Sequence, residues 1–197
     1  MIDIIENKMF EGIKIILSIS LIFCSLFAHA QVSRISGDRI FYIVRHAEKD
    51  TGNNPVLTRA GLTRAGDLYR KLKSKHIDKI YTTRYRRSKM TADSLRIYSG
   101  IDTVQYAADT TGIGLQKLMS EQKGRQKNIL IIAHSNTIPA IIRALDVSNF
   151  RLKEIPENEF DNLYIITQTK KITRVQHKKY GALSAKINKA DKMKLLQ

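Results

Sequence analysis

The sequence predicts an α/β fold, a three-layer α/β/α sandwich with a mostly parallel central sheet and an antiparallel edge strand. Short apolar runs bounded by polar turns alternate with stretches of helical periodicity, which is typical of strand–helix–strand crossovers. Two of the runs, RIFYIV (39–44) and NILIIAH (128–134), are almost continuously apolar, as expected of buried strands. A chain of 197 residues with 43% hydrophobic residues can bury a core of this kind without disulfides or metal.

The first half of the series begins with the strand at residues 39–44 and a turn-rich loop, DTGNNP, at residues 50–55. Thr58 is a candidate N-cap for a helix that runs to about Ser74 and contains the duplication LTRAGLTRAG. The period of this duplication is too short for a repeat architecture. The residues expected on the inward face of the helix are Leu62, Ala65, Leu68, Tyr69 and Leu72.

The elements that follow are a strand at 78–83, a helix at 84–98, a strand at 102–106 and a helix at about 111–123. The inward residues of the helix at 84–98 are expected to be Met90, Ala92, Leu95 and Tyr98. The strand at 128–134 precedes a short helix with Pro139 in its first turn, where proline is tolerated. Residues 162–168 and 171–177 are predicted as a hairpin at a sheet edge.

The N-terminal 30 residues have the pattern of a signal peptide. A lysine precedes an apolar run, and Ala28-His29-Ala30 fits the small-x-small cleavage pattern. We expect cleavage after Ala30 and export, to a periplasm. The alternative is an uncleaved membrane anchor, for which the run is short. At the other end, residues 182–197 form a basic tail.

The single cysteine, Cys24, lies within this predicted signal peptide. Its removal leaves no thiol for nucleophilic catalysis, metal ligation or a disulfide. The net charge of +16 rises to +17 on cleavage, because the removed segment carries two lysines and three acidic residues. Such a charge favours anionic partners: phosphorylated molecules, nucleic acid or an anionic membrane surface.

Two histidines stand where parallel α/β sheets bind ligands. His46 and His134 each follow an apolar strand, and ligands lie beyond the carboxyl ends of such strands. We therefore expect the two imidazoles to meet in one crevice. His76 and His177 lie among lysines and are expected to be exposed.

Arginines accompany both histidines. Arg45 precedes His46, and Arg84, Arg86 and Arg87 open the helix after the second strand. A guanidinium fork matches phosphoryl oxygens, and a helix N-terminus also favours anions. The alternative for Arg84 or Arg86 is an ordinary solvated basic face.

Four segments resemble the histidine phosphatase superfamily, whose fold is called phosphoglycerate-mutase-like. They are VRHAEK, PVLTRAGLTRA, IYTTRYRRSKMTA and ILIIAHSNTIPAIIRAL, and together they span roughly residues 40–145. The first motif is similar to that of the small R-H-A-E-K phosphatase branch. The resemblance implies a histidine-phosphatase-like domain over residues 31–181.

The resemblance also implies a chemistry, that of a phosphoric monoester hydrolase. His46 would be the nucleophile and form a phosphohistidine, while Arg45, Arg87 and His134 would hold the non-bridging oxygens. The substrate would be a phosphorylated small molecule or a phosphoprotein. No metal or organic cofactor is implied.

One departure concerns the proton donor, often a Tyr-Asp pair after the third strand in this branch. The chain has Tyr106-Ala107-Ala108-Asp109 there, so Asp109 is the candidate donor and Glu48 a substitute. General acid catalysis contributes about 10²–10⁴-fold in rate. Without it, aryl phosphates and phosphohistidine would be affected least.

Two other functions remain open. A metal-dependent hydrolase could use His46 and His134 with Glu48 or Asp109, although such sites normally have more ligands. A catalytically weak or inactive member could bind anionic ligands through the same basic pocket. Specific nucleic-acid binding is not expected, because tryptophan is absent and no stacking platform is evident.

Overall fold

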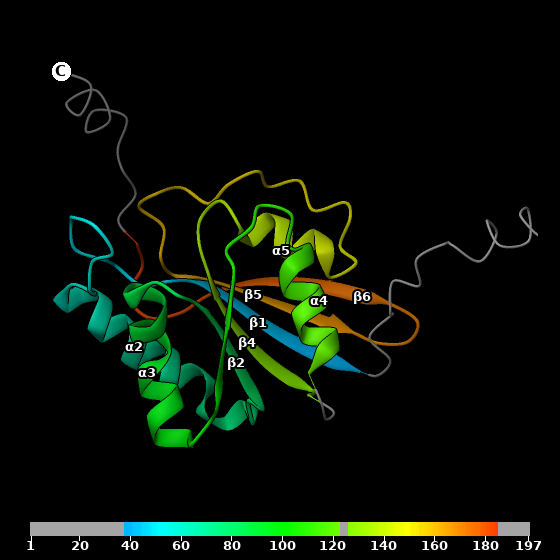
Figure 1. Ribbon diagram of the computed structural model, residues 1–197, viewed down its shortest axis with the longest axis horizontal. Helices are drawn as coiled ribbons and strands as arrows, with labels where there is room; N and C mark the ends of the chain where they lie inside the picture. Colours follow the sequence, from blue (N-terminus) through cyan, green and yellow to red (C-terminus); the bar gives the residue numbers. More distant parts are fainter. Residues whose placement is uncertain (1–37, 123–125, 185–197) are drawn as a thin grey trace, which may run out of the picture. The chain divides into compact units, whose positions relative to one another are not determined.

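The computed structural model describes residues 38–122 and 126–184 (Figure 1). The predicted signal peptide lies outside the described residues, as does the basic tail from residue 185 onward. Within the described ranges, no helix is long and apolar enough to cross a membrane.

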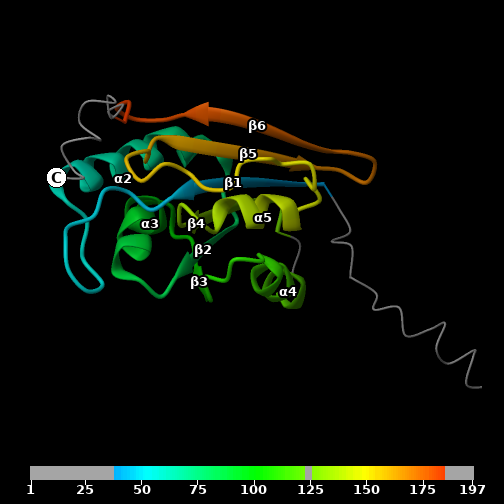
Figure 2. The ribbon, with the colours of Figure 1, turned by 90° about the horizontal axis from the view of Figure 1, so that it is seen from above.

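The described residues form a single six-stranded sheet flanked by helices (Figures 1 and 2). The strands are β1 (Arg39–Arg45), β2 (Lys79–Thr83), β3 (Thr103–Tyr106), β4 (Asn128–Ala133), β5 (Asn162–Gln168) and β6 (Thr173–Lys179). The helices are α2 (Arg59–Leu72), which continues into the short 3₁₀ helix η1 (Lys73–Lys75), α3 (Arg86–Ser99), α4 (Ile113–Glu121) and α5 (Ile138–Ala144).

The strand order is β3-β2-β4-β1-β5-β6. The first four strands are mutually parallel, whereas β5 is antiparallel to both β1 and β6. The predicted fold class is therefore confirmed, including the hairpin at one edge. Because β1 and β4 are parallel neighbours, their carboxyl ends lie side by side.

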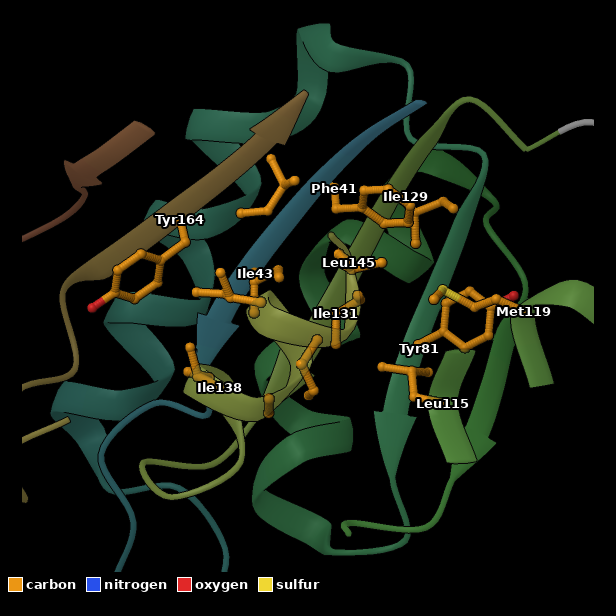
Figure 3. Close-up of a cluster of buried hydrophobic side chains, with 14 of the residues drawn as sticks. Phe41, Ile43, Tyr81, Leu115, Met119, Ile129, Ile131, Ile138, Leu145 and Tyr164 are labelled. Atoms are coloured by element: carbon orange, nitrogen blue, oxygen red, sulfur yellow. The ribbon is translucent and has the colours of Figure 1, made fainter. Parts of the chain in front are cut away.

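Each face of the sheet buries its own apolar cluster. Phe41, Ile43, Ile129 and Ile131 pack on the side of α4 and α5 (Figure 3). Their neighbours in sequence, such as Val44, pack on the side of α2 and α3. Burial on both faces explains why the β1 and β4 sequences are continuously apolar rather than alternating.

Two residues predicted to point inward are exposed, so those predictions were wrong. Leu62 is 52% exposed, because the buried stripe of α2 passes instead through Gly61, Arg64 and Ala65. Tyr98 is 74% exposed near the end of α3 and packs against Tyr69, with ring centroids 5.2 Å apart and ring planes inclined at 41°.

Candidate active site

The structure brings His46 and His134 together at the carboxyl ends of β1 and β4. The pairing of Arg45 with Ala133 sets this register, and the His46 amide donates to the Ala133 carbonyl at 2.9 Å. The two ring centroids are 5.3 Å apart and the ring planes are inclined at 60°. Both residues are buried, at 3% and 7% exposure.

His46 is held as a neutral imidazole with one free nitrogen. Its Nδ1 lies 2.8 Å from the Ala47 carbonyl oxygen, which can only accept, so Nδ1 carries the proton and donates. The Nε2 atom therefore keeps its lone pair. Burial lowers the pKa of His46 to about 3, assisted by the positive charges of the pocket, although the bond to Ala47 opposes this.

His134 is oriented by the end of β2. Its Nε2 lies 3.1 Å from Thr83 Oγ1, and the Thr83 hydroxyl itself donates to Ser88. Nε2 is therefore the donor to Thr83, which leaves Nδ1 as the ring nitrogen able to contact a ligand. Burial, followed by the charges of Arg87 and Arg45, lowers the pKa of His134 to about 4.

The Arg45 side chain is buried beside His46 and bound by the connection between α5 and β5. Its Nη1 donates to the carbonyls of Pro156 at 3.0 Å, Glu157 at 2.8 Å and Glu159 at 3.4 Å. Its Nη2 donates to Glu157 Oε2 at 2.6 Å, and the Phe160 ring lies 4.3 Å from the guanidinium carbon.

Arg87 faces the same pocket from the first turn of α3. Its guanidinium carbon lies 4.3 Å from the centre of the Tyr85 ring, and that ring packs edge-on against His134. The buried Nε of Arg87 has no hydrogen-bond partner among the described residues. Arg84 and Arg86 are exposed, as the solvated-face alternative expected.

A pocket of about 380 Å³ is lined by Arg45, His46, Arg87 and His134 together. The remaining lining includes Lys49, Tyr85, Ala108, Ser135, Glu154 and Glu157. Four residues predicted from distant parts of the sequence thus converge on one cavity. Buried imidazoles and guanidinium groups make this cavity suited to an anion of phosphoryl size.

Asp109, the candidate proton donor, is not among the residues that line this pocket. Its carboxylate accepts from the Thr111 amide at 2.8 Å, the Thr111 hydroxyl at 2.6 Å and the Gly112 amide. Partial burial acts to raise the pKa of Asp109, but these hydrogen bonds outweigh it and lower the pKa. Asp109 organises the start of α4, and Ala108 lines the pocket instead.

Glu48, the substitute donor, is also directed elsewhere. The single N–H of Arg64 Nε is shared by the two Glu48 carboxylate oxygens, each at 2.9 Å, and Oε1 also accepts from Arg64 Nη2 at 2.7 Å. The pair lines a separate cavity of about 480 Å³ that also includes Phe160 and contains no histidine.

Two further pocket residues, Glu154 and Glu157, were not predicted from the sequence. Both accept from Ser135 Oγ, at 3.3 and 2.9 Å respectively. They lie in a connection without periodicity, and its only signal was a group of glutamates in a strongly basic chain. Within residues 38–122 and 126–184, no group of three or more His, Cys, Asp or Glu side chains is arranged to hold a metal ion.

Residues 41–109 match the family model described as histidine phosphatase superfamily (branch 1). Over this segment the chain is similar to the histidine phosphatase superfamily. The matched segment contains Arg45, His46 and Arg87, and the fold adds His134 from β4. No curated protein sequence matches the chain.

Solved structures of several phosphatases share the fold. A protein described as the putative phosphohistidine phosphatase SixA from Agrobacterium tumefaciens has 18% identity and a TM-score of 0.53, over 73% of this chain and 96% of that chain. A mycobacterial glucosyl-3-phosphoglycerate phosphatase has 15% identity and a TM-score of 0.55, over 74% and 99%. The α-ribazole phosphatase of Shigella flexneri has 12% identity and a TM-score of 0.53, over 74% and 96%.

Proposed function

We propose that the protein is a phosphatase that hydrolyses a phosphomonoester through a phosphohistidine on His46, without a metal ion. One observation carries this proposal. A neutral His46 with a free Nε2 stands beside His134 in a cavity lined by two arginines. A neutral imidazole is a nucleophile, whereas a protonated one is not.

In the proposed first step, the His46 Nε2 lone pair attacks phosphorus and the bond to the ester oxygen breaks. Arg45 and Arg87 donate to the non-bridging oxygens, on which charge is spread in the transition state. The phosphoryl dianion favours a proton on Nδ1 of His134, and the resulting imidazolium donates to the third oxygen. Water then attacks the phosphohistidine and releases inorganic phosphate. The proton on Nδ1, shared with the Ala47 carbonyl, stabilises the phosphorylated ring.

The lining of the pocket supports a preference for good leaving groups. Ala108 lines the pocket close to the position where the resemblance predicts a proton donor. The carboxylates of Asp109 and Glu48 are hydrogen-bonded to Thr111 and Arg64 instead. The similar solved structures are described as a putative phosphohistidine phosphatase, a glucosyl-3-phosphoglycerate phosphatase and an α-ribazole phosphatase. A phosphorylated small molecule or a phosphoprotein therefore fits the site as substrate.

One observation favours a second function, anion binding with little or no turnover. No carboxylic acid predicted as proton donor lines the pocket, and a carboxylate, Glu157, already contacts Arg45. A site of this kind would bind phosphate through the same arginines without releasing an alcohol efficiently.

We also propose export to a periplasm, on the signal-peptide pattern of residues 1–30. The N-terminal sequence of protein recovered from a periplasmic fraction would then start at Gln31. Recovery of the full-length chain from membranes would favour the uncleaved anchor instead.

The test of the catalytic proposal is hydrolysis of an aryl phosphate in the presence of EDTA. His46→Ala should abolish turnover, and Arg87→Ala should lower kcat/KM by about 10²-fold or more, as expected for loss of a transition-state donor. Rapid quenching at alkaline pH should trap a phosphoryl group on His46.

His76→Asn is the matched control, because His76 is exposed and lies outside the pocket. It should keep wild-type activity. Undiminished turnover in His46→Ala would reject His46 as the nucleophile, and loss of wild-type activity in EDTA would favour the metal-dependent alternative.

A further inference from the structure

An anionic side chain already occupies part of the candidate phosphoryl pocket. The Glu157 carboxylate lies 2.6 Å from Arg45 Nη2 through Oε2, and its other oxygen accepts from Ser135 Oγ at 2.9 Å. Ser135 follows His134 directly, so the carboxylate bridges the two halves of the site. A phosphoryl group that uses Arg45 must compete with this carboxylate.

The two edges of the Arg45 guanidinium contact different groups. Nη1 is anchored by the carbonyls of Pro156, Glu157 and Glu159, which are backbone groups. Along the other edge, Nη2 contacts the Glu157 carboxylate, and the buried Nε has no hydrogen-bond partner among the described residues. Nε and Nη2 together form the fork that binds an oxyanion with two hydrogen bonds.

This arrangement lets the carboxylate leave without disturbing the arginine. The backbone anchors on Nη1 remain in place when the Glu157 side chain rotates away. The Glu157 side chain is 75% exposed, so its carboxylate regains water when it leaves the Arg45 side chain, which is 3% exposed. The other hydrogen bond of the Glu157 carboxylate is with Ser135, which also has Glu154 as an acceptor.

We propose that Glu157 is a resident anion that occupies the phosphoryl-binding edge of Arg45 in the free protein and is displaced by the phosphoryl group. The inference rests on the proposed function, because it takes the pocket to be a phosphoryl site. Glu157 then limits affinity for phosphate and returns to Arg45 as the product leaves, which favours release.

The charge state of Glu157 fits this role. Partial burial acts to raise its pKa, but the hydrogen bonds from Ser135 and Arg45 outweigh burial and lower the pKa. The side chain is therefore a carboxylate at neutral pH. A phosphate dianion and this carboxylate repel each other, so they cannot share Arg45.

The experiment is calorimetric titration of the purified protein with inorganic phosphate and with vanadate, in EDTA. Glu157→Gln keeps the shape and the backbone carbonyl but removes the charge. It should bind phosphate about two- to fivefold more tightly, the gain expected for losing one competing ion pair whose carboxylate is exposed. Glu157→Ala should show the same direction.

Glu154→Gln is the matched control. It removes one negative charge from the same pocket and the same Ser135 contact, but Glu154 makes no ion pair with Arg45. Its affinity for phosphate should change by less than about twofold, as for a screened charge. An equal gain in Glu154→Gln would show a general charge effect and overturn the proposal, as would unchanged or weaker binding in Glu157→Gln.

Turnover assays separate this proposal from the proposed function. If phosphate affinity changes in the variants as predicted but the wild-type protein hydrolyses no phosphomonoester, the phosphatase proposal is rejected and the competition between Glu157 and phosphate is supported. If Glu157→Gln leaves phosphate affinity unchanged but loses alkyl phosphate turnover more than aryl phosphate turnover, Glu157 is a proton donor. That result would overturn its role as a competing anion.

Discussion

At the scale of single residues, burial decides the chemistry of the two histidines. Ordinary histidines titrate near neutrality, whereas His46 and His134 have pKa values of about 3 and about 4. Desolvation is the main cause in both, because a buried imidazolium would lose its hydration beside two arginines. The same burial that prepares His46 for attack therefore makes stability depend on pH.

This dependence has a definite sign. Below pH 6.5 the unfolded chain binds protons on both histidines, but the folded protein does not until pH falls to about 4 and about 3. Each histidine should therefore lower the free energy of unfolding by about 1.4 kcal/mol per pH unit as pH falls through this window. Stability is greatest above the window and is lost on acidification.

Urea unfolding at pH 7, 6 and 5 measures the slope. His134→Gln, which retains a donor for Thr83, should remove about half of the slope due to the two histidines, whereas His76→Asn should keep it. A slope unchanged by His134→Gln would contradict the burial argument. Carboxylates with lowered pKa contribute mainly below this range.

The residue scale also shows where sequence reasoning reached its limit. His46, Arg45, Arg87 and His134 were found because strand ends and motif spacing mark them. Asp109 and Glu48 were candidates by proximity in sequence, but each is satisfied by nearer partners: Thr111 and Gly112 for Asp109, and Arg64 for Glu48. Hydrogen-bond partners of this kind depend on three-dimensional neighbours, which no spacing rule supplies.

At the scale of elements, helix α2 supports the loop that follows His46. Thr58 is its N-cap, as predicted, and accepts from the Gly61 amide at 3.1 Å. The Thr58 amide donates to the Glu48 carbonyl at 2.9 Å, and Gly61 packs against that same carbonyl. The helix therefore fixes the chain two residues beyond His46, the proposed nucleophile.

The duplication LTRAGLTRAG provides a matched test of this contact. In Gly61→Ala the added Cβ would overlap the Glu48 carbonyl oxygen, a backbone atom, so we expect a loss of about 1–3 kcal/mol of stability. In Gly66→Ala the Cβ would meet only the flexible Arg70 side chain at 3.4 Å. That variant should gain about 0.5–1 kcal/mol from better helix propensity.

Urea denaturation of the two variants distinguishes these outcomes. Equal effects on stability would mean that Gly61 is present only by duplication, without a packing role. If Gly61→Ala is destabilised as expected, its aryl phosphate turnover should fall as well, since the contact lies beside the segment that carries His46.

At the scale of the whole molecule, the formal net charge is +16, and the proposed substrate of the candidate site is an anion. A field of one sign increases the rate at which oppositely charged ligands arrive, and salt screens it. For an anionic phosphomonoester, kcat/KM should therefore fall several-fold as ionic strength rises from about 0.01 to about 0.3 M, where the Debye length shortens from about 30 Å to below 8 Å.

Steady-state kinetics across a salt series checks this prediction. At saturating substrate, kcat should change little, because arrival no longer limits the reaction. A kcat/KM that is independent of salt would show that the net charge does not speed substrate arrival and serves another partner, for example an anionic membrane surface.

The sequence by itself determined the fold class, the strands that end at the site and the four residues that line it. These follow from periodicity and from motifs, which are properties of neighbours along the chain. Only the tertiary structure decided which carboxylates reach the pocket: it placed Glu157 on Arg45 and held Asp109 and Glu48 on other partners. The physical reason is that a loop side chain binds whatever donor the packed elements bring within about 3 Å, and a one-dimensional pattern does not encode that distance.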